Sequence, residues 1–177
     1  MKTKLLFLTS AEAIAAKDGL TAIVRVMKKQ PPAGYKCCHD YRTTLGYPAS
    51  EGKYWVGFYG NPEDPIYYES PLGKPGDILA GKETGMPETE GGIPTGGYIY
   101  KATNSPEPDG DISLKWRSPI LMPSWAVRHW FKVKSVRAMQ NKEIPLDSLI
   151  KGEVIMPQNN SINTWLWYTE LERSEKP

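Results

Sequence analysis

The chain has 177 residues, of which 40% are hydrophobic, so it is long enough to bury a core of its own. Its 22 basic and 20 acidic residues leave a formal net charge of +2, which excludes a strongly basic nucleic-acid coat but not a local basic patch. The 16 glycines, 16 prolines, 10 tyrosines and 6 tryptophans favour many turns and short strands over long helices. We therefore expect a single domain over residues 1–177, of the α+β class and rich in β-structure.

The cysteines and the first apolar run indicate in which cellular compartment the protein is expected. Cys37 and Cys38 are neighbours, and because a disulfide between them would close a strained ring, we expect reduced thiols, as in the cytoplasm. The apolar run over residues 5–8 is too short for a signal peptide, and no stretch approaches transmembrane length. We predict a cytoplasmic protein without membrane contact. No group of His, Cys, Asp and Glu has metal-site spacing, so we predict neither a metal nor a cofactor.

The N-terminal segment predicts a strand followed by a helix. Residues 5–8 form the expected strand. Thr9 and Glu12 have the spacing of a capping box for a helix over residues 11–17, and Gly19 is placed to end it.

Residues 20–27 are rich in β-branched side chains and predict a strand with two different faces. One face is suited to a core and consists of Ala22, Val24 and Val26. The other face carries a hydroxyl and a guanidinium and could line a cleft. Its residues are Thr21, Ile23, Arg25 and Met27.

The rest of the chain predicts short strands separated by turns and loops. The expected strands cover residues 53–59, 66–68, 78–79, 98–102, 126–137 and 163–173. The first two form a hairpin, and the third follows a Pro-Gly-Asp turn. The other expected segments are a loop over residues 30–50, a flexible loop over residues 86–97 that could serve as a lid, and one or two helical turns over residues 145–150. In the last strand, one face would hold Trp165, Trp167, Thr169 and Leu171.

One polar grouping could carry chemistry, although no phosphate-binding loop, dinucleotide motif or serine-hydrolase nucleophile is present. Glu83 follows the strand at residues 78–79, and its carboxylate could meet polar side chains of the 20–27 strand if the two strands adjoin. The members of this grouping are Thr21, Arg25, Lys82 and Glu83. The alternative is an ordinary surface ion pair. His129 is expected to be structural or exposed.

Aromatic and basic side chains recur between residues 98 and 130. Such rings and guanidinium groups together can stack on and hydrogen-bond an unpaired base. The residues are Tyr98, Tyr100, Trp116, Trp125, Trp130, Arg117 and Arg128. The alternative is that the rings fill the core of a small barrel.

Four segments are similar, in order, to the pattern of a known family. Residues 18–31 resemble Gly-Arg-Lys-Thr-x-Thr-Arg-Arg followed by Gln-Pro, and residues 74–85 resemble Pro-Gly-Asp-x-Leu-x-Val-Arg-Glu-Thr-Trp. Residues 116–128 resemble Trp-x-Pro-Ser-Ile-His-Met-Pro-Arg-x-Ala-x-Arg, and residues 165–173 resemble a closing strand. In this order the segments resemble the ASCH-domain proteins of the PUA-like superfamily, in particular a group common in phages and prophages.

The resemblance implies a fold and several activities. The fold is a small mixed β-barrel of the PUA-like type, with one main N-terminal helix, short flanking helices and a cleft for nucleic acid or a nucleoside. Some bacterial relatives are amidohydrolases of N4-acylated cytidines, which use a Lys and a Thr of the first motif and a Glu of the second. Others are regarded as RNA-binding proteins, and nuclease activity has been proposed for some. A phage-encoded chain would act in the cytoplasm of the host cell.

The chain departs from the family pattern mainly at cleft positions. The family lysine falls on Leu20, which can neither carry a proton nor orient a carboxylate. Ala80, Gly81 and Gly85 stand where the family has larger residues, which predicts a wider and more apolar cleft. The residues that keep the family identity are Thr21, Arg25, Glu83, Thr84, Met122, Pro123 and Arg128.

Three hypotheses follow, and the first favours a protein that is not an enzyme. It is a monomeric binder of RNA or of a nucleoside-like small molecule. Its ligand contacts would come from Arg25, Lys82, Thr84, Tyr98, Tyr100, Met122, Ser124, Trp125 and Arg128. The second is a residual amidohydrolase with Glu83 as general base and Thr21 assisting. The third is an apolar small-molecule pocket, diverged or redesigned, or a phage–host interaction module.

Overall fold

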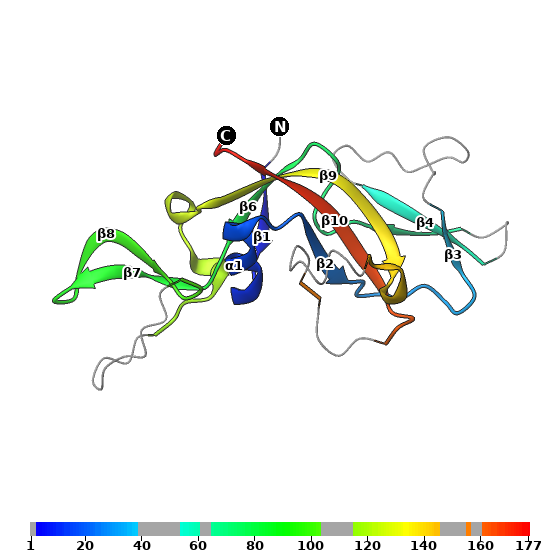
Figure 1. Cartoon of the computed structure of the whole chain (residues 1–177), viewed down its shortest axis with the longest axis horizontal. Coiled ribbons are helices and arrows are strands. Elements are labelled where there is room, and N and C mark those ends of the chain that lie inside the picture. The colour runs from blue at the N-terminus through cyan, green and yellow to red at the C-terminus, as the bar shows by residue number, and fades with distance from the viewer. Residues whose placement is uncertain (1–2, 39–53, 61–64, 104–114, 146–154, 157–160) are drawn as a thin grey trace.

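The computed structural model describes residues 3–38, 54–60, 65–103, 115–145, 155–156 and 161–177 (Figure 1). These residues form ten strands, one α-helix and the three 3-10 helices η1 (Pro119–Leu121), η2 (Ser124–Ala126) and η3 (Asn141–Glu143). The β-rich α+β class is confirmed. The expected helical turns over residues 145–150 fall almost wholly outside the described residues, as does more than half of the expected loop over residues 30–50.

The largest sheet has five strands. In spatial order they are β1 (Thr3–Phe7), β6 (Ile78–Lys82), β9 (His129–Gln140), β10 (Trp165–Ser174) and β2 (Ala22–Val26). β1 and β6 run parallel, and the other neighbouring strands are antiparallel. β9 and β10 run together across the middle of the molecule (Figure 1). Among the described residues, β1 and β2 are the two edges, so this sheet is not closed into a barrel.

A second sheet contains β3 (Lys36–Cys38), β4 (Trp55–Tyr59) and β5 (Ile66–Glu69), all antiparallel. The pairing of β4 with β5 confirms the expected hairpin. β3 lies within the expected loop, where the surrounding Gly and Pro residues hid a short strand from sequence reasoning.

A two-stranded ribbon of β7 (Gly85–Glu90) and β8 (Ile93–Tyr100) projects from the rest of the molecule (Figure 1). The expectation of a flexible loop over residues 86–97 is therefore wrong. Gly91 and Gly92 connect the strands with φ angles of 55° and 83°. Two successive positive φ angles are typical of a type I′ hairpin turn, which glycine adopts without strain. The glycines that suggested a loop are the residues that make this turn.

The helix α1 (Ser10–Asp18) follows the local sequence signals closely. The Thr9 Oγ1 accepts from the Glu12 N–H at 3.2 Å, and the Glu12 Oε2 accepts from the Thr9 N–H at 2.8 Å, which is the expected capping box. Gly19 ends the helix with φ 116° in the left-handed region. No helix among the described residues is long and apolar enough to cross a bilayer.

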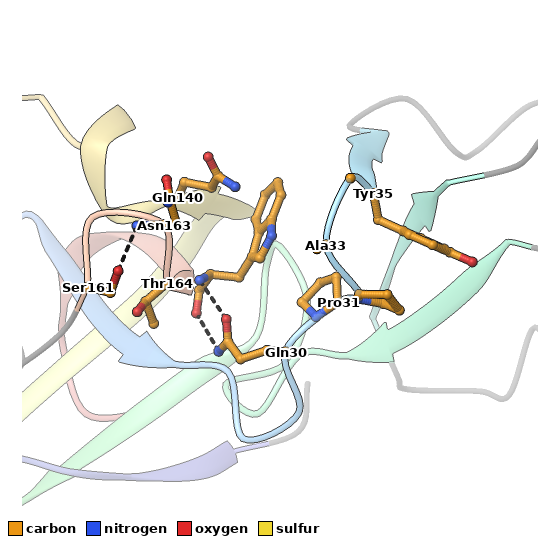
Figure 2. Close-up of a pocket in the computed structure, with 11 residues that line it drawn as sticks. Gln30, Pro31, Ala33, Tyr35, Gln140, Ser161, Asn163 and Thr164 are labelled. Carbon is orange, nitrogen blue, oxygen red and sulfur yellow. Dashed lines mark hydrogen bonds between the residues drawn. The ribbon is translucent and has the colours of Figure 1, made fainter.

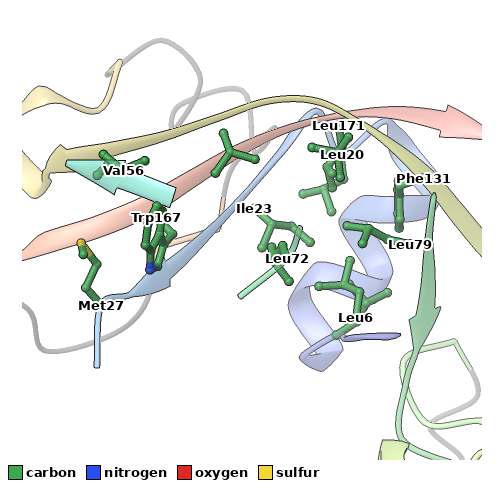
Figure 3. Close-up of a cluster of buried hydrophobic side chains, with 14 of the residues drawn as sticks. Leu6, Leu20, Ile23, Met27, Val56, Leu72, Leu79, Phe131, Trp167 and Leu171 are labelled. Carbon is green, nitrogen blue, oxygen red and sulfur yellow. The ribbon is translucent and has the colours of Figure 1, made fainter. Parts of the chain in front are cut away.

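The main hydrophobic core lies between α1, the large sheet and β4, and many of its side chains are shown in Figure 3. The predicted shared face of the last strand is supported, since Trp165, Trp167 and Leu171 belong to this core and Thr169 is buried. The opposite face is buried too, because Leu166 and Tyr168 belong to a second cluster. The two faces of β2 were predicted in part. Ala22 and Val24 are buried as expected and belong to the second cluster, whereas Val26 is 38% exposed. On the face expected beside a cleft, Arg25 and Met27 line a cavity, but Ile23 and Met27 also belong to the main core.

Candidate functional site

A buried ion pair lies where β6 ends and β9 begins. The strand register places Gly81 opposite His129, so Glu83 at the exit of β6 comes beside Arg128 at the entry of β9. The Arg128 Nε donates to Glu83 Oε1 at 2.7 Å, and its Nη2 donates to Oε2 at 2.9 Å. Only 1% of Glu83 is exposed. One guanidinium therefore holds both oxygens of a buried carboxylate.

The same guanidinium contacts an aromatic ring. The Arg128 Cζ lies 3.9 Å from the centroid of the Tyr100 ring, a cation–π contact, and its Nη1 donates to Thr103 Oγ1 at 3.2 Å. The Tyr100 hydroxyl donates to the Ala126 carbonyl at 2.7 Å. These bonds fix the arginine and the ring relative to η2.

Aromatic rings continue from the ion pair to the surface. Tyr98 contacts Tyr100 with ring centroids 5.2 Å apart and contacts Trp125 edge-on at 6.0 Å. Trp125 is 55% exposed, and on the preceding 3-10 turn Ile120 and Leu121 are each 64% exposed. We call Ile120, Leu121 and Trp125 the Trp125 patch. Such adjoining exposed apolar residues are a common mark of a binding surface.

The two tyrosines of this region remain neutral. Burial, with smaller contributions from Tyr100 and Glu83, raises the pKa of Tyr98 above its ordinary value of 10.0, although Arg117 acts against it. Burial likewise raises the pKa of Tyr100, with Arg128 opposing. The Tyr98 hydroxyl is buried and has no hydrogen-bond partner among the described residues. Its donor and its acceptor are therefore unsatisfied beneath the surface.

His129 belongs to the same region, although sequence reasoning left it out of the site. It is 6% exposed, and its Nε2 lies 3.5 Å from Glu83 Oε1 without forming a hydrogen bond. The sequence signal that could have found it is the alternation of side chains along a strand. In the first half of β9 the buried residues fall at every second position, at His129, Phe131 and Val133. Burial lowers the pKa of His129 below its ordinary value of 6.5; Glu83 opposes this shift, and Arg128 and Arg173 favour it.

The lowered pKa of His129 predicts a loss of stability in mild acid. Between the folded-state pKa and 6.5, the unfolded chain binds a proton that the folded chain does not, so the free energy of unfolding falls as the pH falls through this window. In His129→Gln this part of the pH dependence should disappear. Urea denaturation of both proteins between about pH 8 and pH 5 measures it. Parallel pH profiles for the two proteins would contradict the assignment.

Most of the other predicted site residues lie around Glu83, and the rest lie elsewhere in the fold. Lys82 and Thr84 flank Glu83 and are half-buried, and Ser124 begins η2 and is exposed. Met122 is buried, and its Sδ accepts from the Glu83 N–H at 3.3 Å. The structure thus brings most of the predicted residues together around Glu83.

Arg25 and Thr21 do not bind Glu83. The Arg25 guanidinium forms an ion pair with Glu12, with Nη1 bonded to Oε1 and Nη2 to Oε2. Thr21 is exposed, and its carbonyl accepts from the Leu171 N–H at 2.7 Å. The expected grouping of Thr21, Arg25 and Glu83 is therefore replaced by two separate ion pairs, Glu83–Arg128 and Glu12–Arg25.

The small residues near Glu83 do not leave open space. A Cβ atom on Gly81 would lie 2.9 Å from Leu8 Cδ1 and 3.1 Å from the His129 carbonyl. A Cβ atom on Gly85 would lie 2.4 Å from the Tyr98 ring and 2.5 Å from the Ile99 carbonyl. The expectation of a widened cleft is thus wrong at these two positions, because neighbouring groups fill the volume that larger side chains would take.

Two cavities elsewhere are lined by described residues. One, of about 420 Å³, lies between residues 30–35 and the start of β10. In it the Gln30 Nε2 donates to the Trp165 carbonyl at 3.1 Å, and its Oε1 accepts from the Trp165 N–H at 2.7 Å (Figure 2). The Nε2 also donates to the Met27 carbonyl at 2.7 Å. The other, of about 610 Å³, lies between β1 and β2, and we call it the edge groove. Glu83 lines neither cavity.

No family model, curated protein or solved structure matches the chain. Among the described residues, no three His, Cys, Asp or Glu side chains gather as they would around a metal ion. The groups that the structure shows at the site are an ion pair, neutral tyrosines and an exposed tryptophan.

Proposed function

We propose that the protein binds an unpaired nucleobase, in single-stranded RNA or in a modified nucleoside, at the Trp125 patch. The observation that carries the proposal is the Trp125 ring, which is 55% exposed and lies edge-on to Tyr98 beside the Arg128–Tyr100 contact. An exposed indole offers a stacking face to any base, and such a contact is typically worth about 1–3 kcal/mol.

Cations near the patch favour a ligand with phosphates. Arg117 is exposed, and its backbone pairs with Gly85, two residues beyond Glu83. Lys101 is also exposed, and its N–H donates to the Thr84 carbonyl at 3.0 Å. Both cations thus flank the Glu83–Arg128 pair, where they can contact the backbone of a strand whose base stacks on Trp125.

The amidohydrolase alternative has less support than simple binding. A general base must lie within reach of the substrate proton. The Glu83 side chain is 1% exposed, and both of its oxygens face the Arg128 guanidinium, so the carboxylate is not accessible from the surface. In our proposal this ion pair supports the binding surface and carries out no chemistry.

The finer fold assignment is also a proposal. We infer that the five-stranded sheet and α1 are an open relative of the PUA-like barrel of ASCH-domain proteins. Its support is that two residues matching the family motifs, Glu83 and Arg128, meet although 45 positions apart. The single helix directly after the first strand also fits the architecture that the resemblance implies.

Removing Trp125 tests the proposal. We expect the wild-type protein to bind a fluorescein-labelled single-stranded RNA at low salt, and Trp125→Ala to weaken binding about 5- to 150-fold, which corresponds to about 1–3 kcal/mol. Fluorescence anisotropy measures both. Ile93→Ala is the matched control, because Ile93 is 72% exposed at the far end of the ribbon.

Each other outcome has a distinct meaning. Absence of RNA and nucleoside binding at low salt, or equal affinity of Trp125→Ala and the wild type, refutes the proposal. Arg117→Ala should reduce the dependence of affinity on salt, whereas Trp125→Ala should leave that dependence unchanged. Turnover of N4-acetylcytidine that Glu83→Gln abolishes would favour the hydrolase instead.

A further inference from the structure

The edge groove lies between the two edges of the large sheet. It is lined by residues 5–7 of β1 on one side and residues 25–29 at the end of β2 on the other, with Leu72 and Trp167 among its other lining residues. Leu5 is 53% exposed and Phe7 is 42% exposed. Large apolar side chains on an edge strand invite pairing with another chain, and natural proteins usually avoid them.

The backbone of β2 directs unused groups into this groove. The Met27 N–H donates to the Trp165 carbonyl, and the Leu171 N–H donates to the Thr21 carbonyl, so the odd-numbered residues of β2 bond to β10. The N–H and C=O of Val26 therefore point away from β10. The Val24 carbonyl does the same and accepts from Arg25 Nη1 at 2.9 Å.

Backbone groups of β1 also point toward the groove, from the opposite side. The Leu8 N–H donates to the Lys82 carbonyl, so the even-numbered residues of this segment face β6. The Phe7 carbonyl points the other way and accepts from Arg25 Nη2 at 2.9 Å. The N–H and C=O of Leu5 share this outward direction, and no described residue pairs with them.

Arg25 shows what fits between the two edges. Its guanidinium donates at 2.9 Å to a carbonyl on β1 and at 2.9 Å to a carbonyl on β2. These are ordinary N–H···O distances, and the two donors act as the N–H groups of an intervening strand would. Beyond Arg25 the same two edges continue, and there they enclose the groove.

We propose that the edge groove binds an extended peptide segment of a partner protein, which adds a strand between β1 and β2. Main-chain hydrogen bonds to Leu5 and Val26 would hold it, and its apolar side chains would contact Leu72 and Trp167 in the groove. This site is separate from the Trp125 patch and does not depend on the proposed function.

The charges of the groove define the partner further. Its charged lining residues are Arg25, Lys28, Lys29 and Glu69. Glu12 neutralises Arg25, whereas the two adjacent lysines are exposed at the end of β2. Because the groove has an excess of positive charge at that end, the segment is expected to be apolar with carboxylates at one end.

A defined peptide tests the proposal. The probe is a fluorescein-labelled Glu-Glu-Val-Ile-Val-Thr-Val peptide, and fluorescence anisotropy measures its binding to the full chain at low salt. A copy that is N-methylated at alternate residues lacks the donors for one strand edge. We expect saturable binding of the probe with a Kd below about 1 mM and at least a tenfold loss for the N-methylated copy.

Two sets of variants locate the site. Val26→Pro removes an N–H that faces the groove and takes no part in the β2–β10 ladder, so the fold should persist while affinity falls about tenfold. Lys28→Glu/Lys29→Glu leaves the backbone unchanged and should weaken binding similarly. The control Lys17→Glu/Lys142→Glu makes the same charge change at exposed positions elsewhere.

The results that would overturn the proposal are specific. They are the absence of saturable binding, equal binding of the N-methylated copy, and equal affinity of the Lys28→Glu/Lys29→Glu protein and its control. Displacement of the probe by decanoate, together with tolerance of N-methylation, would identify the groove as a site for amphipathic carboxylates.

Discussion

Arg128→Leu is expected to lower the free energy of unfolding by about 3–5 kcal/mol, the usual cost of leaving a buried charge without its partner. Glu83 is 1% exposed, and its carboxylate would lose both Arg128 hydrogen bonds. His129 Nε2 lies 3.5 Å from Glu83 Oε1 without forming a hydrogen bond, and burial opposes the charged form of its imidazole, so it replaces the lost arginine only in part. Urea denaturation followed by tryptophan fluorescence measures the loss.

Two further variants separate this effect from the general cost of losing an arginine. Glu83→Gln should cost less than Arg128→Leu, because the Arg128 side chain is 29% exposed and can be hydrated. Arg137→Leu breaks an ion pair with Glu170 in which the side chains are 48% and 33% exposed, and it should cost about 0–1 kcal/mol. Equal losses for Arg128→Leu and Arg137→Leu would show that the Glu83 environment is not the reason.

The elements that sequence predicted well depend on neighbouring residues. The capping box of Thr9 and Glu12 and the helix end at Gly19 involve groups a few positions apart, and the β4–β5 hairpin joins strands that follow each other directly in the chain. The ribbon of β7 and β8 was missed because glycine and proline are rare in strands but serve in turns and edge strands. The strand order of the large sheet is fixed by long-range pairing, which no local pattern contains.

Sequence reasoning identified most residues of the site but not which of them form ion pairs with each other. Glu83, Tyr98, Tyr100, Met122, Trp125 and Arg128 were all candidates, and the structure gathers them. Which acid binds which arginine depends on how the strands and the helix are placed in space, and sequence alone grouped Arg25 with Glu83, whereas it binds Glu12. Glu12 was interpreted only as a capping residue, although its carboxylate also binds Arg25.

The partner assignments change the interpretation of Glu83. A free carboxylate could act as a base, but one bonded twice to an arginine holds that arginine against Tyr100. Under the proposed function, Glu83 therefore acts through Arg128 and does not contact the ligand. Whether the surface binds RNA is then a question about Trp125 rather than about Glu83.

The other large loss of stability is expected for Arg25→Leu, again about 3–5 kcal/mol. Glu12 is 2% exposed, and without Arg25 the bonded partner that its carboxylate would keep among the described residues is the Thr9 N–H. The Phe7 and Val24 carbonyls on the two sheet edges would lose their shared donor as well. Urea denaturation again measures the change in the free energy of unfolding.

Arg25→Lys separates charge from geometry in this prediction. A lysine keeps the positive charge but is a single point donor and cannot bond two carboxylate oxygens and two carbonyls from a planar fork, so its loss should be intermediate. Glu12→Gln/Arg25→Leu should lose less than the sum of the single variants, because the second change removes the unpaired charge that the first creates. Additive losses would mean that Arg25 stabilises the sheet edges independently of Glu12. In that case Arg25 would keep its hydrogen bonds to the Phe7 and Val24 carbonyls in Glu12→Gln, and the edge groove between β1 and β2 would keep its width.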